Sequence, residues 1–286
     1  MEKTLLKILI MQVLLVLKEI IEELLFCDKY YIILYISCDC PEPVQFRLQD
    51  PATPDMEGLI GLNKHVLCLI IIIVCLIGWL LMSTIENFEE FNHPKSSNFY
   101  HSDVLEIVWT SIPALTLFCL ACPSFNLLYS MDELPSPDLS VKISGHQWFW
   151  SYDISDYKEL ATCNNSDVNL RYVCYLLTEE KLLEKGRNGF FRLLETNKRL
   201  LLPVGTHLRF LVTSVDVLHS WTVPSLCVKI DACPGRLNQI HTYIKRSGLF
   251  FGQCSEICGV NHGFMPIAIL VVPSTQFHFY VTAKLF

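Results

Sequence analysis

The chain has 286 residues, of which 51% are hydrophobic and 18% are charged, with a formal net charge of −7 and a mean hydropathy of +0.36. This composition is too apolar for an ordinary soluble domain and too charged for a protein built mainly of membrane helices. The acidic balance argues against a nucleic-acid partner and favours a basic protein partner. A membrane anchor joined to one water-exposed domain fits best.

Residues 1–43 form an N-terminal extension in which Lys3 and Lys7 precede an apolar run over residues 8–17. The run is short for a membrane span and resembles a signal-like leader. The acidic residues that follow it do not suit a matrix-import peptide, and no small-residue cleavage motif comes after them. We expect this extension to be a removable leader.

Two segments are expected to span a bilayer, at about residues 64–84 and 104–129. The first has an uncharged centre and, with its flanks, reaches the ~20 residues that a hydrocarbon core requires. The second carries Pro113 and Pro123, which are tolerated in a membrane helix whose freed carbonyls face a partner. The polar link between the segments is too short for a domain. Residues 44–134 therefore predict a helical hairpin with both chain ends on the same side.

Asp103 and Glu106, at the start of the second span, have the spacing of a helix capping box. A carboxylate at this place also interacts favourably with the helix N-terminus. Ionisable residues in membrane segments are functional candidates as well, for example as a point of proton uptake. From the residues alone, both interpretations of Glu106 stay open.

Pro135 and Pro137 mark a linker, after which residues 135–286 have the pattern of short alternating strands separated by turns. Residues 178–186 are the exception, with a short helical or loop character. Such a mostly β domain is typical of a sandwich or a Greek-key barrel. The clearest strands are expected at residues 139–143, 146–153, 206–213 and 266–272.

Alternation along residues 146–153 places Trp148, Trp150 and Tyr152 on one face of a strand. Burial statistics alone favour a core position for such a stripe. An exposed Trp would instead offer a contact and tunnelling point to a redox partner. The nearby Asp153 and Asp156 would then supply a negative rim that steers a basic protein.

Soft donor side chains gather near the C-terminus, with Cys254, Cys258, His262 and Met265 in one Gly- and Asn-rich segment and His219 upstream. The Cys pair by itself is compatible with a disulfide or half of a zinc site. Met as an added donor favours copper over zinc, because copper sites recruit weak axial thioethers. Two thiols are also the number needed to bridge a pair of copper ions. The set favours a role in electron transfer.

Six stretches occur in order along the chain, and together with the helical hairpin they cover it from about residue 44 onward. They are Gln49-Asp-Pro-Ala-Thr-Pro54, Glu106-Ile-Val-Trp-Thr-Ser-Ile-Pro-Ala114, Gly145-His-Gln-Trp-Phe-Trp-Ser-Tyr152, Asp216-Val-Leu-His-Ser-Trp221, Asp231-Ala-Cys-Pro-Gly-Arg-Leu-Asn-Gln239 and residues 252–266. By these stretches the chain resembles subunit 2 of mitochondrial-type cytochrome c oxidases.

The resemblance implies a cupredoxin-like Greek-key barrel that follows the transmembrane hairpin and carries the binuclear copper A centre. In that family pattern Cys254 and Cys258 bridge the two coppers through their thiolates. His219 and His262 each bind one copper, with Met265 as a weak axial ligand. The backbone carbonyl of Glu256 completes the set, and the Glu256 side chain reaches a magnesium ion at the interface with subunit 1, as suits a hard oxygen donor.

The resemblance also implies an electron-accepting role. Trp148 would receive electrons from cytochrome c, with Asp153 and Asp156 in the docking rim. The electrons would pass to the haem–copper centres of subunit 1, where oxygen is reduced to water with proton pumping. Glu106 would lie at the entrance of a proton channel. Two further residues would lie near the haem propionates and the magnesium ion, namely Asp231 and Arg236.

The implied location is the mitochondrial inner membrane, as a multi-pass protein of the lipid bilayer with its copper domain in the intermembrane space, beside subunit 1 and further oxidase subunits. Some residues depart from the family pattern. Phe149 stands where Tyr is usual, and Cys227 and Cys233 stand at positions that are normally small or aliphatic.

Three other classes compete with this interpretation. A thioredoxin-fold copper chaperone would have one span and a His after the Cys pair, whereas His219 precedes it. A quinol oxidase subunit would lack the copper ligands. A structural membrane protein with an outer disulfide would give no copper signal.

Overall fold

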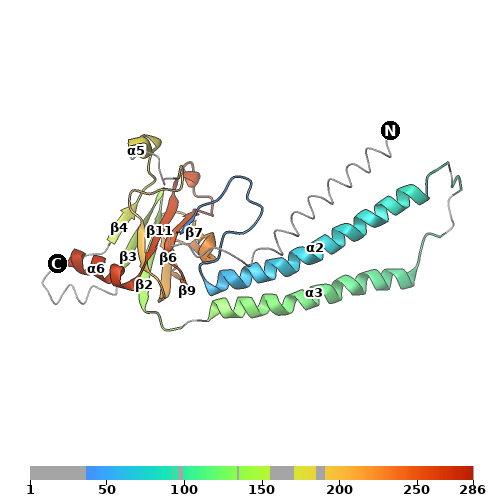
Figure 1. The fold of residues 1–286 in the computed structure, drawn as a ribbon, viewed down its shortest axis with the longest axis horizontal. Coiled ribbons are helices and arrows are strands. Elements are labelled where there is room, and N and C mark those ends of the chain that lie inside the picture. The colour runs from blue at the N-terminus through green and yellow to red at the C-terminus, as the bar shows by residue number, and fades with distance from the viewer. Residues whose placement is uncertain are drawn as a thin grey trace. The chain divides into compact units, whose positions relative to one another are not determined.

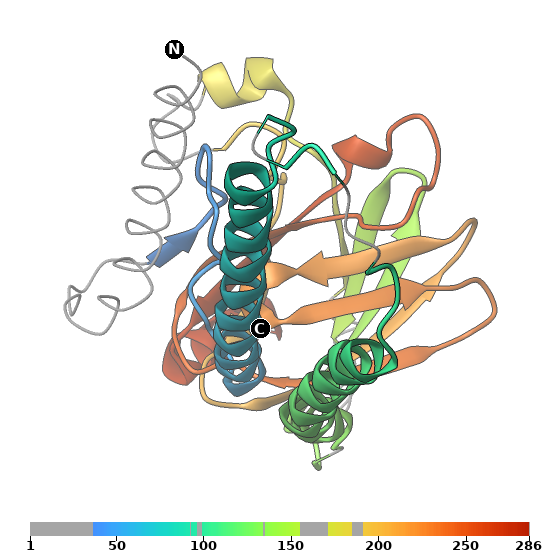
Figure 2. The ribbon, with the colours of Figure 1, turned by 90° about the vertical axis from the view of Figure 1, so that its right-hand side faces the viewer.

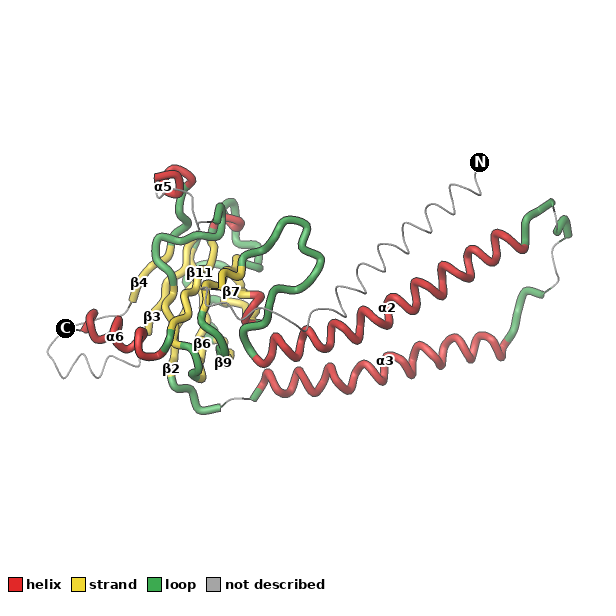
Figure 3. The backbone as a smooth tube through the Cα atoms, viewed as in Figure 1, coloured by secondary structure: helices red, strands yellow, loops and turns green. Residues whose placement is uncertain are grey.

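A computed structural model describes residues 37–91, 93–95, 99–133, 135–154, 171–184 and 191–285. Its helices and strands fall into two groups, a pair of long helices and a β-rich domain (Figures 1 and 3). Most of the expected leader and the candidate docking residue Asp156 lie outside the described residues.

The long helices are α2 (Pro54–Asn87) and α3 (Asp103–Asp132), and both are long and apolar enough to cross a membrane. Each extends beyond the span expected from the sequence. They pack against each other near one end, where a Cβ placed on Gly58 of α2 would lie 2.7 Å from Cδ1 of Leu127 in α3. The two-helix hairpin is therefore confirmed.

The start of each helix has a side-chain cap. Thr53 Oγ1 accepts a hydrogen bond from the Met56 backbone N–H at 3.2 Å, ahead of α2. In α3 the cap is Ser102, whose backbone is extended and whose hydroxyl accepts from the Leu105 N–H at 3.4 Å. The expected capping box that begins at Asp103 is wrong by one residue, because Asp103 is already the first helical residue. Spacing alone did not distinguish two adjacent capping side chains.

Two larger sheets and a two-stranded ribbon form the β domain, in the orders β1-β10-β11-β5, β4-β3-β2-β6-β9 and β7-β8. Three neighbouring pairs are parallel: β1 with β10, β5 with β11, and β2 with β6. The strands are β1 (Ser37–Asp39), β2 (Leu139–His146), β3 (Phe149–Ile154), β4 (Arg171–Cys174), β5 (Leu200–Pro203), β6 (His207–Ser214), β7 (His219–Val223), β8 (Val228–Ala232), β9 (Asn238–Tyr243), β10 (Gly248–Gln253) and β11 (Pro266–Val272).

The core is formed by side chains from both larger sheets. Ile143 of β2 and Phe210 of β6 are fully buried in one cluster with Phe250 of β10 and Ile269 of β11. The sheets thus bury apolar faces against each other, as in a sandwich. The predicted order, a two-helix hairpin followed by a β domain, is confirmed.

One strand prediction is wrong in its register. Residues 146–153 were expected to form a single strand, but His146 ends β2 and pairs with Phe149, the first residue of β3. Gln147 and Trp148 therefore make a two-residue turn. The apolar alternation continues through the turn, so the pattern did not reveal it. Trp150 and Tyr152 are buried as expected, whereas Trp148 is partly exposed at the tip.

Two short helices complete the domain. Helix α5 (Glu179–Glu184) agrees with the short helical character expected there. Helix α6 (Ser274–Leu285) was not anticipated, because its sequence is rich in aromatic and β-branched residues. Phe277 and Val281, four positions apart, bury their side chains in the core. Tertiary packing thus overrides local propensity in this segment.

The hairpin and the β domain are joined by specific hydrogen bonds at the start of α2. Ala52 donates through its backbone N–H to the carbonyl of Ser225 at 3.0 Å, and its own carbonyl accepts from the Lys245 N–H at 2.8 Å. The Lys245 ammonium also contacts both carboxylate oxygens of Glu57, at 2.7 and 2.9 Å. These bonds tie the first turn of the helix to the domain that carries the soft donor set.

Candidate metal centre

The soft donors come together where two strands meet. His219 is the first residue of β7, and Cys254 directly follows β10. These strands can lie close because Gly252 of β10 has no side chain: a Cβ there would lie 1.8 Å from the Thr222 carbonyl oxygen of β7. Cys258 then returns to the same place through the tight loop after β10. The loop and the close strand contact together bring residues 35 or more positions apart to one point.

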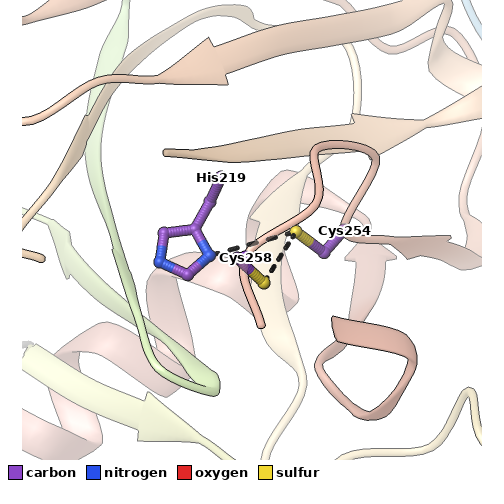
Figure 4. Close-up of side chains that lie close together, drawn as sticks. All are labelled: His219, Cys254 and Cys258. Atoms are coloured by element: carbon purple, nitrogen blue, oxygen red, sulfur yellow. Dashed lines mark hydrogen bonds between the residues drawn. The ribbon is translucent and has the colours of Figure 1, made fainter. Parts of the chain in front are cut away.

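Three of the expected ligands form one compact buried group, shown in Figure 4. The sulfur atoms of Cys254 and Cys258 are 4.0 Å apart, and His219 Nδ1 is 4.0 Å from the Cys254 sulfur. All three donor atoms lie within 4.8 Å of one another. Both cysteines are free thiols. The geometry therefore does not support a disulfide between Cys254 and Cys258.

The remaining expected ligands surround this group. His262 Nδ1 lies 3.5 Å from the Cys258 sulfur, and the Met265 sulfur lies 3.5 Å from the same thiol. The Glu256 carbonyl oxygen lies 3.4 Å from the Cys254 sulfur. Met265 is buried, whereas His262 and Glu256 are partly exposed. The structure brings all six expected ligand residues together.

The two thiols are electrostatically unequal. Burial acts to raise the pKa of Cys254, but hydrogen bonds involving His219 and the backbone of Ser220 outweigh it and lower that pKa. The pKa of Cys258 is raised by burial and by the adjacent Cys254. Two neighbouring thiols cannot both ionise easily without a compensating positive charge. The pair is thus suited to a cation that neutralises both thiolates.

One residue of the site was missed as a functional candidate. Asp216 Oδ1 lies 2.8 Å from His219 Nε2, while its Oδ2 accepts from the Gln147 backbone N–H at 2.6 Å. Its pKa is lowered, because burial is outweighed by the hydrogen bonds from His219 and from the Gln147 backbone. An ionised carboxylate only accepts, so Nε2 of His219 carries a proton toward Asp216, while Nδ1 faces the Cys254 thiol. The signal that could have found Asp216 is its place three residues before a ligand His.

The donor set fits copper. Two thiols, two imidazoles and a thioether are soft or borderline ligands, and a thioether is typical of copper sites and unusual for zinc. Each thiol has its own imidazole, His219 beside Cys254 and His262 beside Cys258. A single tetrahedral zinc ion would instead require all its donors around one point. Two thiols, two imidazoles and a thioether are enough donors for a pair of copper ions.

Two aromatic residues connect the centre to its surroundings. Trp148 Nε1 donates to the carbonyl of Cys258 at 3.3 Å, and its ring lies against Gly259, where a Cβ would approach to 3.1 Å. Trp150 is fully buried, donates to the Met265 carbonyl at 3.3 Å and presents its ring to His219 with 5.8 Å between ring centres. The partly exposed Trp148 is therefore bonded to the backbone of a ligand residue.

The other candidate residues lie away from this cluster. Asp153 is partly buried on β3, opposite Arg171. Glu106 lies in the first turn of α3, where one carboxylate oxygen is 3.2 Å from His101 Nδ1. Asp231 is exposed on β8, where it pairs with Ser220 of β7. Arg236 is exposed in the turn that follows β8.

Comparisons with known proteins agree with the fold and the site. The family described as cytochrome c oxidase subunit II matches twice, with its transmembrane domain at residues 41–127 and its periplasmic domain at residues 139–272. Cytochrome c oxidase subunit 2 of Cyanidium caldarium is 47% identical over 247 residues, which are 86% of this chain and 93% of that protein.

A relative from Glycine max, named cytochrome c oxidase subunit 2, mitochondrial, is 45% identical over 86% of this chain and 61% of its own length. Among solved structures, the periplasmic domain of cytochrome oxidase subunit II from Bradyrhizobium japonicum is 35% identical, covering 53% of this chain and 96% of that domain, with a TM-score of 0.44. The matches to both domains and the identity to full-length relatives show that the chain belongs to the cytochrome c oxidase subunit 2 family.

Proposed function

We propose that this chain is the electron-accepting subunit of a cytochrome c oxidase and that its β domain holds a copper A centre. The observation that carries the proposal is the pair of buried thiols 4.0 Å apart, each beside its own imidazole. Cys254 and Cys258 would bind both coppers, His219 and His262 one each, and Met265 would be an axial ligand. The Glu256 carbonyl would complete the set.

When bound, a thiolate-bridged copper pair supplies one-electron transfer with little change in the surrounding protein. The chain's own residues prepare the site for this. Asp216 orients His219, and the buried position of His219 prevents water from replacing it. Cys254 and Cys258 are held by a loop that begins at a paired strand, so the ligands need not reorganise. Rigid ligands keep the energetic cost of adding or removing one electron low.

Electrons would enter through Trp148 from cytochrome c. The Trp148 indole is partly exposed and hydrogen-bonded to the Cys258 carbonyl, which supports a short path from the surface to a ligand residue. Asp153 and Asp156 would contribute negative charge to the docking rim for this basic partner. The electrons would leave toward the haem–copper centres of subunit 1, where oxygen is reduced to water and protons are pumped.

Three further roles belong to the same proposal. The Glu256 side chain would bind a magnesium ion shared with subunit 1, since carboxylates suit this hard cation. Asp231 and Arg236 would lie near that ion and the haem propionates. Glu106 would lie at a proton channel entrance, where its contact with His101 supports a role in holding charge at the helix start.

We place the protein in the mitochondrial inner membrane, with α2 and α3 in the bilayer and the copper domain in the intermembrane space. Two candidate spans and the mitochondrial name of a relative support the placement. A hairpin leaves the segments before α2 and after α3 on the same side of the bilayer. Its other neighbours would be further oxidase subunits.

The test is reconstitution of the full-length chain in detergent with copper, followed by electron paramagnetic resonance. We expect a purple protein with two coppers and a signal from one electron shared equally by both metals. Replacement of His219 by Asn should abolish the shared signal, whereas His207→Asn, a His on β6 that belongs to no expected ligand set, should leave it intact. Absence of a delocalised signal in the wild-type protein would overturn the copper A assignment.

A further inference from the structure

A second pair of thiols lies at the edge strand β1, with Cys38 in the strand and Cys40 directly after it, just before the family match begins at residue 41. Cys38 is exposed and Cys40 is partly buried, and both are free. Cys38 and Cys40 line the same cavity. The two thiols lie within hydrogen-bonding reach of each other. They form a vicinal dithiol that the copper centre does not use.

The chain after this strand encloses the dithiol on one side. Residues 42–50 turn back so that Cys38 and Cys40 line a half-open cavity of about 100 Å³. The turn is held by Gln45, whose side-chain oxygen accepts from the Glu42 N–H at 3.0 Å. Arg47 also lines the cavity. A cavity of this size accommodates one small ion or a few water molecules.

The number of donors identifies the kind of ion. Asp39, which lies between the thiols in sequence, is engaged in an ion pair with Arg246. Within the described part of the chain, no third His, Cys or carboxylate joins the two thiols in a compact ligand group. Zinc requires four ligands, and calcium and magnesium require oxygen. Thiolates select soft cations, of which Cu(I) is satisfied by two sulfur ligands.

We propose that Cys38 and Cys40 bind one Cu(I) ion as a two-thiolate site, separate from the copper centre. Two S–H bonds break and two Cu–S bonds form, so two protons leave to solvent while copper stays monovalent. The product carries one negative charge. Arg199, which is ion-paired with Glu195, lies close enough to Cys38 to favour its thiolate. The cavity lining contains Arg47 together with the carboxylates of Asp39, Glu42 and Asp50.

Without an ion both thiols are mostly protonated at neutral pH. Partial burial, then the neighbouring Cys40 and Asp39, raise the pKa of the Cys38 thiol to about 11. Burial likewise raises the pKa of Cys40. Thiols with raised pKa values are poor nucleophiles at neutral pH, whereas a soft cation with high sulfur affinity displaces their protons.

The position of the dithiol relates it to the copper centre. Strand β1 pairs in parallel with β10, with Cys38 opposite Leu249 and Asp39 opposite Phe250, and β10 leads directly into Cys254. Figure 2 shows β1 as the blue arrow of the β domain. Both thiol pairs therefore adjoin strands of one sheet, and they would face the same compartment, because they lie before α2 and after α3. A Cu(I) ion delivered to this domain would encounter either pair.

The test uses the full-length chain in detergent, reduced and without oxygen, titrated with Cu(I) against a colorimetric Cu(I) chelator. The background variant is C254S/C258S, which lacks the copper-centre thiols, so the outcome does not depend on the proposed function. We expect this variant to bind one Cu(I) tightly. Adding C38S and C40S should remove that ion, whereas adding C227S and C233S, a matched pair of partly buried thiols in the same domain, should not.

A second measurement covers the case in which the combined variants fail to fold. In the wild-type chain, Cu(I) should protect Cys38 and Cys40 from alkylation, as read by mass spectrometry of their peptide. The proposal is overturned if Cu(I) binding is equal with and without Cys38 and Cys40. It is also overturned if both thiols alkylate at the same rate with and without Cu(I), or if the peptide is two mass units lighter, which would show a disulfide.

Discussion

At the scale of single residues, Asp216 bonds to Nε2 of His219 and leaves Nδ1 facing the Cys254 thiol. Its carboxylate accepts from Nε2 and from the backbone of the Gln147 turn, so one side chain fixes both the imidazole and the loop that carries Trp148. Carboxylate–imidazole pairs of this kind orient metal ligands and raise their basicity. Asp216 is thus a positioning residue that contacts no metal itself.

Asp216→Asn should weaken copper binding by about 10- to 100-fold. The amide has a single oxygen, so it cannot accept hydrogen bonds from both His219 and the Gln147 backbone. Competition titration with a copper chelator measures the affinity, and electron resonance shows whether the signal shifts. Asp138→Asn is the control, because Asp138 also accepts a backbone N–H, from His207 at 2.8 Å, but lies directly before β2, at the end of that strand opposite to Gly145, whose Cβ position adjoins His219. Equal affinities in the two variants would refute the positioning role.

Trp148→Phe should keep the aromatic ring but lose the hydrogen bond from Nε1 to the Cys258 carbonyl. We expect copper content and spectrum to be unchanged while electron uptake from reduced cytochrome c slows by an order of magnitude or more. Stopped-flow reduction of the copper-loaded chain measures the rate. The control is Trp79→Phe, an exposed Trp on the membrane helix α2, which should have the wild-type rate. A normal rate in Trp148→Phe would place electron transfer elsewhere.

At the scale of elements, the site depends on how closely β7 approaches β10. The contact at Gly252 leaves no space for a side chain, and it places a residue two positions before Cys254 beside the strand of His219. The strands are not neighbours in one sheet, so neither alternation nor spacing predicts the approach. The glycine therefore serves the geometry of the metal centre through backbone packing.

Gly252→Ala should lower the free energy of unfolding by about 3 kcal/mol or more, because the new Cβ would meet a backbone oxygen that cannot rotate away. Denaturant unfolding of the metal-free protein measures the change. Gly263→Ala, where a Cβ meets nothing within 4 Å, should change stability by no more than about 0.5 kcal/mol. Similar stabilities of both variants would show that the strands separate without penalty.

At the scale of the whole molecule, the hairpin and the β domain differ in what their stability depends on. The hairpin exposes apolar side chains that a bilayer would cover, whereas the β domain buries titratable groups in its core. Cys174 is buried beside Tyr152 and Tyr172, and burial raises the pKa of its thiol to about 12. The folded domain thus retains a proton that the unfolded chain releases near pH 9.

Ionisation of Cys174 should therefore cause no change in the free energy of unfolding with pH below pH 8. As the pH rises from 9 toward 12, the free energy of unfolding should fall. The slope is about 1.4 kcal/mol per pH unit for this one group, since the folded state binds one more proton. Comparing the wild type with Cys174→Ala isolates the contribution, because other groups cancel. A constant difference between the two proteins from pH 7 to 11 would contradict the prediction.

The sequence by itself determined the hairpin and the β class of the domain, and it identified the six candidate ligand residues that the structure brings together. Long uncharged apolar runs leave few alternatives to a membrane span, and soft donors at Cys254, Cys258, His262 and Met265 identify their chemistry by residue type. These features are local, so composition and spacing reveal them. Strand 266–272 was likewise predicted with its observed bounds, because it is a short apolar run that begins at a proline.

Only the tertiary structure decided what depends on distant contacts. The turn at Gln147 and Trp148, the helix α6, the close approach at Gly252 and the role of Asp216 all follow from which segments pack together. The strand that places Cys38 and Cys40 beside β10 joins residues more than two hundred positions apart. Local propensity carries no information about such partners, since the free energy that selects them comes from burial and backbone pairing in the assembled core.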